Sequence, residues 1–111
     1  MTEQRICIPV NADGTIQGRL GQAHAVATCT VDDSGVRDWV EHTVNWDWTY
    51  GVDVPGVNHP RVIRFLQAHQ VDVVVADEIC PGVERTLGVL GIDVRAHRTG
   101  MARDLVLDSA A

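Results

Sequence analysis

The chain has 111 residues, of which 45% are hydrophobic and 22% charged, a balance typical of a single globular domain that spans residues 1–111. Its formal net charge is −6 and all nine basic residues are arginines, so binding to nucleic acid is disfavoured and Schiff-base or P-loop lysine chemistry is excluded. The sequence has no apolar run near the roughly 20 residues of a membrane span and no recognisable signal peptide, so we expect a cytoplasmic protein.

The first half of the chain predicts three strands that pair as an antiparallel meander. Each candidate strand is a short apolar or alternating run that ends at turn residues, and the runs are 5–10, 24–31 and 36–44. The first run is almost continuously apolar, as in a strand that is buried on both faces. In the third run, unbroken alternation would place Val36, Val40 and Val44 on one face and Trp39 on the other.

The segment 45–58 is longer than most loops of a compact domain and carries Trp46, Trp48 and Tyr50. Its aromatic content argues against simple disorder. The tryptophans could pack the loop down, close a pocket or form a dimer contact, and the sequence leaves these alternatives open.

The second half changes to alternating helices and strands. The predicted elements are a helix at 59–70, a strand at 71–76, a helix that starts at 81 and ends before Gly91, a strand at 92–96, and a last helix. Apolar or aromatic residues at helical spacing mark the inward faces: Val62, Ile63, Leu66 and His69; Val83, Leu87 and Leu90; Met101, Leu105 and Val106. Pro60 fits the first turn of the first helix, and Thr99 is the expected cap of the last one.

This order of elements predicts that four loops meet at one edge of the sheet. The loops are 11–24, 45–59, 77–82 and 97–100. Ligands in α/β sheets bind beyond the carboxyl ends of parallel strands, which lie at the same edge. Most of the soft ligand residues and their neighbours fall there: His24, His59, Cys80, His97, Arg19, Trp46 and Trp48. His42 lies near this edge, whereas His69 is predicted at the opposite one.

Cys80 precedes Pro81 and Gly82 at a predicted helix start. A helix N-terminus favours the thiolate form, which binds metal, and leaves backbone N–H groups open to an anion. Cys80 could equally be a small structural cysteine, and His59 could be a metal ligand or a partner of a loop carboxylate. Cys7 and Cys29 lie within apolar strands and are expected to be structural.

Several segments resemble the dinitrogenase iron–molybdenum cofactor biosynthesis family, the NifX/NafY-like domains that also form the C-terminal part of NifB. The matching segments are Ile6-Cys7-Ile8-Pro9-Val10, the run 18–23, the run 71–76 with Cys80-Pro81-Gly82 after it, and the run 90–94. The resemblance implies a ribonuclease H-like α/β fold, with three α/β/α layers around a five-stranded sheet of order 3-2-1-4-5 in which strand 2 is antiparallel. It also implies a non-catalytic domain that binds an iron–sulfur or iron–molybdenum cluster.

Two departures from the family pattern bear on that function. Arg19 and Leu20 stand where the family has a loop histidine and an aromatic residue, which weakens the case for the usual mode of cofactor binding. Cys80 stands where the family has the first glycine of a Gly-Pro-Gly-like stretch, and it could supply a substitute ligand.

The leading hypothesis is therefore a cytoplasmic accessory protein that carries a metal cluster and has no catalytic residues. Its expected metal ligands are His59 and Cys80, and its other cofactor-binding residues are Arg19, Gly21, His24, Pro81 and Gly82. Expected partners are the cluster and a cluster donor or acceptor protein, without nucleic acid or membrane, for a monomer or weak homodimer. One alternative is a protein-interaction module that uses the Trp46/Trp48 loop without a cofactor. A nuclease-like enzyme with Asp77, Glu78 and a divalent ion is disfavoured by the acidic charge.

Overall fold

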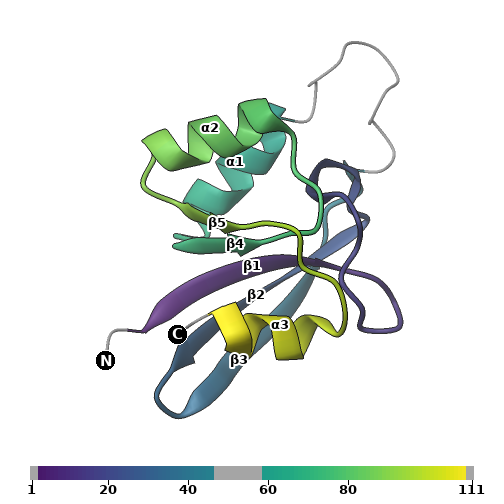
Figure 1. The fold of residues 1–111 in the computed structure, drawn as a ribbon, viewed down its shortest axis with the longest axis vertical. Coiled ribbons are helices and arrows are strands. Elements are labelled where there is room, and N and C mark those ends of the chain that lie inside the picture. The colour runs from purple at the N-terminus through teal and green to yellow at the C-terminus, as the bar shows by residue number, and fades with distance from the viewer. Residues whose placement is uncertain (1–2, 47–58, 110–111) are drawn as a thin grey trace.

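The structure is a computed structural model that describes residues 3–46 and 59–109, with only the backbone of His59 and Ser109 (Figure 1). Its elements in chain order are β1 (Gln4–Val10), the short 3₁₀ helix η1 (Leu20–Gln22), β2 (Ala25–Asp32), β3 (Gly35–Thr43), α1 (His59–Ala68), β4 (Val73–Val75), α2 (Pro81–Val89), β5 (Asp93–Arg95) and α3 (Ala102–Ser109). Each predicted helix and strand in these ranges is present, and the ends differ from the prediction by a few residues.

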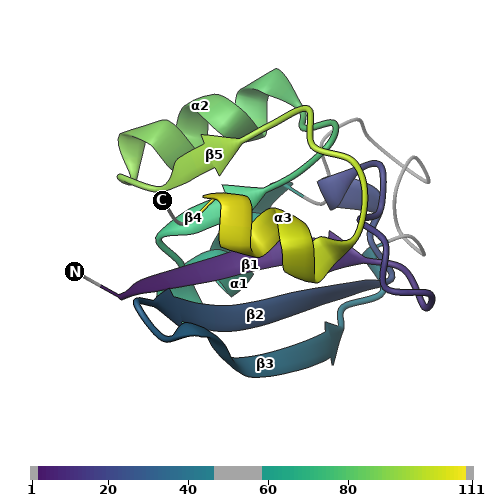
Figure 2. The ribbon, with the colours of Figure 1, turned by 60° about the horizontal axis from the view of Figure 1, so that its bottom comes forward.

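The sheet has five strands in the order β3-β2-β1-β4-β5. Strand β2 pairs antiparallel with both β1 and β3, while β4 lies parallel to β1 and β5 lies parallel to β4. Figure 2 shows the strands in this order with α3 in front of them. The topology implied by the family resemblance is confirmed.

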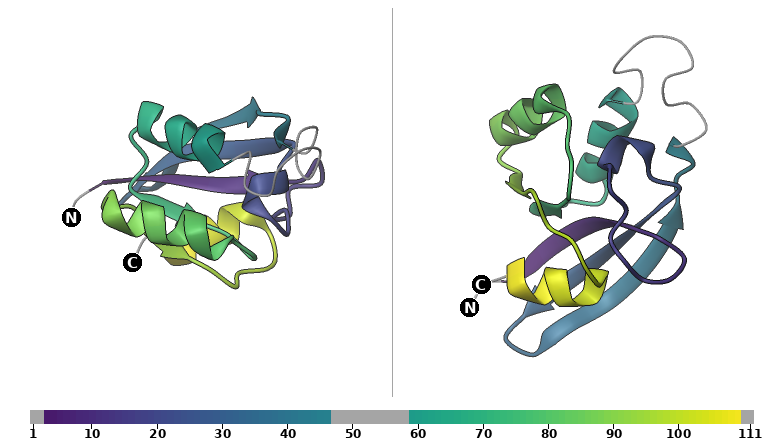
Figure 3. Two further views of the ribbon diagram at one scale, coloured as in Figure 1. Left: turned by 90° about the horizontal axis from the view of Figure 1, so that it is seen from above. Right: turned by 45° about the vertical axis from the view of Figure 1, so that its right-hand side comes forward.

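Two hydrophobic cores lie on opposite faces of the sheet and make a three-layer α/β/α structure. Helices α1 and α2 cover one face, where Val62, Leu66 and Leu87 pack on Cys7 and Val74. Helix α3 covers the other face (Figure 3). The core under α3 includes Ile6, Ile8, Ala27, Cys29, Val73, Val75, Ala102 and Val106. Within the described residues, no helix is both long and apolar enough to span a membrane.

The alternation predicted for the third strand is wrong because β3 contains a bulge. Thr28 pairs with Val40 but Thr30 pairs with Arg37, so β3 carries one extra residue, and Asp38 adopts a left-handed φ of 57°. An extra residue inverts the alternation of the side chains that follow it. Trp39 therefore packs in the core under α3, whereas Val40 points to the other face and is 49% exposed.

Three predictions at helix ends are also wrong. Leu90 is exposed because α2 ends at Val89, after which Gly91 turns the chain with a φ of 81° and Ile92 becomes the buried residue. Helix α3 begins at Ala102, so Thr99 is not its cap. Met101 pairs with the turn at Thr15 instead of facing inward, and its side chain is exposed.

Candidate functional site

The loops that were predicted to share one edge are joined there by backbone hydrogen bonds. The N–H of Glu78 donates to the carbonyl of Gly18 at 2.9 Å, and the N–H of Leu20 donates to the carbonyl of Glu78 at 3.4 Å. On the other side of this loop, the N–H of His97 donates to the carbonyl of Asp77 at 2.9 Å. We call this edge, made by residues 17–24, 43–46, 77–82 and 96–98, the rim.

His24 is also part of the rim, because its carbonyl accepts from the N–H groups of Val44 and Asn45 at 2.9 and 3.0 Å. Its side chain is exposed, as is that of His97. The predicted gathering of distant segments at one edge is therefore confirmed for the described residues of these loops.

Arg19 faces a carboxylate at the rim. Its Nε lies 2.7 Å from Oε2 of Glu78, and both side chains are more than half exposed. Such an exposed ion pair contributes little stability on its own, but here it adds to the backbone pairing of the same two residues. In this pair the guanidinium neutralises the acidic side chain two residues before Cys80.

Cys80 is exposed and occupies the N-cap position of α2, with extended backbone angles. Its thiol makes no capping hydrogen bond, and its carbonyl accepts the N–H of Glu84 at 3.0 Å. Because the first turn of a helix offers no internal acceptors, the N–H groups of Gly82 and Val83 are directed toward the rim; Pro81, which is exposed, has none.

The other two cysteines are buried within the sheet. Burial raises the pKa of Cys7 to about 12 and that of Cys29 to about 11. Both thiols are therefore neutral and inert near neutral pH. Their predicted structural role is confirmed, and Cys80 is the cysteine that solvent reaches.

Among the described side chains, no group of three or more His, Cys, Asp or Glu is arranged to hold a metal ion. His59 is the first residue of α1, but its side chain lies outside what the structure describes. The predicted ligand pair of His59 and Cys80 thus stays a prediction.

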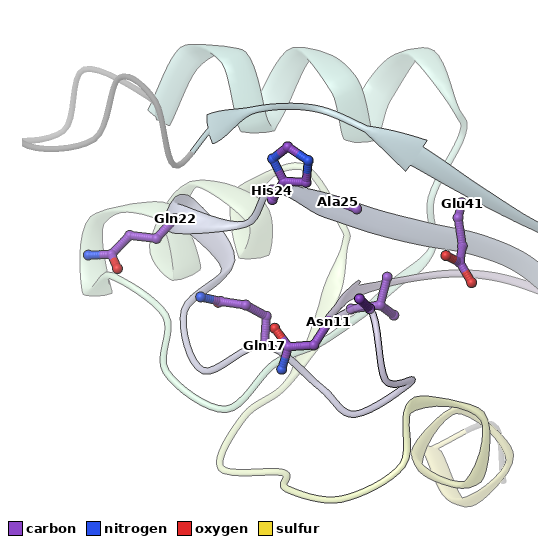
Figure 4. Close-up of a pocket in the computed structure, with 8 residues that line it drawn as sticks. Asn11, Gln17, Gln22, His24, Ala25 and Glu41 are labelled. Carbon is purple, nitrogen blue, oxygen red and sulfur yellow. The ribbon is translucent and has the colours of Figure 1, made fainter.

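A cleft of 710 Å³ opens beside the rim, between the loop after β1 and the start of β2 (Figure 4). Its lining mixes polar and apolar residues, which are Val10, Asn11, Ala12, Gln17, Gln22, His24, Ala25 and Glu41. In Figure 4, Gln22 and Glu41 lie toward opposite ends, with Gln17 and Asn11 between them. The cleft includes the predicted residue His24, and Gly21 precedes its lining residue Gln22 in η1.

The sequence did not reveal this cleft, because its lining comes from four separate segments. Asn11 is held by its own loop, where its Nδ2 donates to Oγ1 of Thr15 and to the carbonyl of Ile16. The N–H of Arg19 donates to Oε1 of Gln17, which joins the wall of the cleft to the rim. The run of turn residues in 11–18 is the sequence signal that could have directed attention to this loop.

Trp46 is a core residue. It is 4% exposed, its ring meets the edge of Phe65 at a centroid distance of 5.7 Å, and its N–H donates to the carbonyl of Ala23 at 3.0 Å. The predicted alternative in which Trp46 forms a contact surface is therefore wrong, because its ring packs inward under α1. Trp48 and Tyr50 lie outside the described residues.

Two histidines that the sequence assigned to opposite edges come together. The rings of His42 on β3 and His69 after α1 have centroids 4.7 Å apart, and Phe65 packs against both. His69 lies on the inward face of the predicted helix, which was the available signal. The sequence could not place that face against β3.

Residues 3–110 match the family model described as "Dinitrogenase iron-molybdenum cofactor". The chain belongs to this family. The assignment confirms the resemblance seen in the sequence and associates the protein with the cofactor for which the family is named.

Solved structures share the fold of this family member. The crystal structure of PH0822 is 16% identical, with 96% of this chain and 88% of that chain aligned at a TM-score of 0.74. The apo form of the orange protein from Desulfovibrio gigas is 21% identical, with 96% and 89% aligned at a TM-score of 0.67. No curated protein matches the sequence.

Proposed function

We propose that this protein is a non-catalytic accessory protein that carries an iron–sulfur or iron–molybdenum cluster, or a related anionic metal species, at the rim. The observation that carries the proposal is the exposed thiol of Cys80 at the start of α2, which makes no capping hydrogen bond to the helix. Membership of a family named for the iron–molybdenum cofactor supports it. The cluster is cargo, which a donor or acceptor protein exchanges with this chain.

The chemistry of the rim suits such cargo. Protein-bound iron–sulfur clusters are held by thiolates and accept hydrogen bonds at their sulfides. Cys80 supplies one thiolate, and the N–H groups of Gly82 and Val83 donate to sulfide or oxyanion groups. Arg19 neutralises Glu78, which would otherwise repel an anionic ligand.

The remaining ligands come from elsewhere. His59 begins the helix beside α2 and is the proposed second ligand from this chain. His24, with Gly21 behind it, is proposed to contact the part of the cargo that extends toward the cleft. The other coordination positions of the metal stay with ligands that travel with the cluster.

The test is anaerobic loading from a synthetic cluster donor, followed by measurement of iron and molybdenum per chain and a visible spectrum. The wild-type chain is expected to retain metal after gel filtration, and Cys80→Ser to lose most of it. Cys29→Ala is the matched control, because it removes a thiol from the opposite core and is expected to retain the cluster.

The result that contradicts the proposal is a wild-type chain without metal, or a Cys80→Ser variant that retains as much as wild type. Far-UV circular dichroism checks that each variant is folded. His59→Ala tests the second ligand, and retention of the wild-type amount of metal would remove His59 from the site.

A further inference from the structure

A group of basic side chains lies on the α1 side of the sheet. Arg5 comes from β1, His42 from β3, and His69 from the turn after α1. The rings of His42 and His69 are in contact, and Arg5 is close enough to His42 to lower its pKa electrostatically. All three side chains are partly exposed. We call these residues, with Thr28 and Thr30, the basic cluster.

Two buried hydroxyls from β2 hold the cluster in place. Thr28 and Thr30 are 2% and 4% exposed. Nη1 of Arg5 donates to Oγ1 of Thr30 at 2.9 Å, and Nε2 of His42 lies 2.9 Å from Oγ1 of Thr28. These contacts anchor one nitrogen of Arg5 and one nitrogen of His42, and the guanidinium of Arg5 has further N–H donors.

The charged groups around the basic cluster are of both signs. In the described part of the chain, no ion pair within 4.0 Å involves the side chain of Arg5, His42 or His69. The nearby acids on this side of β1 and β2, Glu3 and Asp32, share the guanidinium of Arg37 with Asp38.

Two further groups complete the surroundings of the cluster. Oδ2 of Asp72 accepts the backbone N–H of Arg5 at 2.9 Å, and the Cys7 thiol on the same face is buried and neutral. The cluster is a local group of basic side chains in a chain whose net charge is −6. Such groups attract anions when they converge.

The face is also open to a ligand. Val40 on β3 pairs with Thr28 on β2 and is 49% exposed, so α1 leaves this part of the sheet uncovered. The aromatic ring of Phe65 packs against both imidazoles and fixes their positions from the helix side.

We propose that Arg5, His42 and His69 bind a phosphate group, either as inorganic phosphate or at the end of a small phosphomonoester. Donors from three separate elements suit a tetrahedral anion with several acceptor oxygens, and Arg is well matched to phosphate. The site shares no residue with the rim or with the proposed cluster ligands.

Phosphate binding is linked to protonation of His42. Burial lowers the pKa of His42, and the neighbouring His69 and Arg5 lower it further. A bound anion offsets the two electrostatic causes, so it raises the pKa of His42. By reciprocity, the protonated protein binds phosphate more tightly.

The first experiment follows the ring C–H signals of both histidines by NMR as a function of pH, with and without inorganic phosphate at constant ionic strength. We expect phosphate to raise the pKa of His42 by about one unit, which corresponds to tenfold tighter binding to the form with His42 protonated. Glycerol 3-phosphate replaces inorganic phosphate in the second arm. A shift with either probe supports the proposal, and its absence with both overturns it.

The second experiment measures the phosphate dissociation constant of variants by calorimetry at pH 6. His69→Gln and Arg5→Gln are each expected to weaken binding roughly ten- to a hundredfold, the effect of one charge-assisted hydrogen bond. Arg85→Gln is the matched control, because it removes one exposed charge from α2. His69→Gln breaks no side-chain hydrogen bond seen in the described residues, so it stays informative even where Arg5→Gln unfolds.

Equal affinity in His69→Gln and Arg85→Gln would overturn the proposal, because it would show that binding depends on overall charge. Cys80→Ser is expected to bind phosphate as wild type does. Loss of the cluster therefore cannot be confused with loss of the anion.

Discussion

Replacement of Trp46 by alanine distinguishes a core residue from a contact surface. The ring is 4% exposed and packs on Phe65 in the core under α1. A buried aromatic side chain removes about 150–250 Å² from water, which at about 25 cal/mol per Å² is about 4–6 kcal/mol as an upper bound. Substitutions of this kind cost about 3–5 kcal/mol, and we expect that loss for Trp46→Ala.

The assay is equilibrium unfolding in urea followed by circular dichroism, with a thermal melt beside it. The melting temperature is expected to fall by roughly 10–20 °C. Trp39→Ala is the matched control, because Trp39 is only partly buried, with the Arg103 guanidinium 4.4 Å from its ring centroid. It should cost about 1–2 kcal/mol.

A loss below about 1 kcal/mol for Trp46→Ala would refute the packing argument. Light scattering on the same samples measures the molecular mass of the protein in solution. A variant with unchanged stability but a lower molecular mass than wild type would restore the hypothesis that Trp46 lies in a contact between chains.

Three further predictions concern the thiols, a histidine and the bulge. Iodoacetamide should modify the native protein once, at Cys80, because Cys7 and Cys29 are buried and have raised pKa values. Mass spectrometry of peptides identifies the modified cysteine. Rapid modification of either buried thiol would contradict the prediction. In phosphate-free buffer, the free energy of unfolding should fall as the pH drops below about 6.5, because the pKa of His42 is lower in the folded state than in the unfolded state. His42→Gln should make the free energy of unfolding less dependent on pH. An equal slope in wild type and variant would exclude His42 as the source of the pH dependence. Asp38→Gly should raise the free energy of unfolding by about 0.5 kcal/mol and Asp38→Ala should not, because only glycine adopts the left-handed φ of 57° without steric cost. A urea titration in which the alanine variant is the more stable one would contradict the bulge.

The fold was predictable because its strongest signals are local. The apolar runs mark β1 and β4, the proline marks the start of α2, and the glycine marks its end. Each of these elements can therefore be recognised from a few neighbouring residues. The direction of each element then follows from short connections, which is why the shared edge could be derived before any contact was known. The family resemblance supplied the strand order.

The parts that the sequence did not predict depend on a single inserted residue or on contacts between distant segments. No local pattern marks Asp38 as a bulge, yet it moves Trp39 to the opposite face of β3. The contact of His42 with His69 exists because α1 lies over β3, which periodicity does not encode. The position of His59 was predicted at the rim, but its role as a ligand depends on a side chain outside the described residues.

Strand register also explains why cysteine chemistry is confined to one place. Ile6 pairs with Cys29 and Thr28 pairs with Cys7, and paired residues on neighbouring strands share a face of the sheet. Cys7 therefore faces the core under α1 and Cys29 faces the core under α3, so the sheet separates the two thiols. Cys80 follows the sheet at the carboxyl end of β4 and lies in neither core. A substitution at Cys80 can thus change metal binding without opening a cavity, which makes it the variant that separates the function of the rim from the stability of the fold.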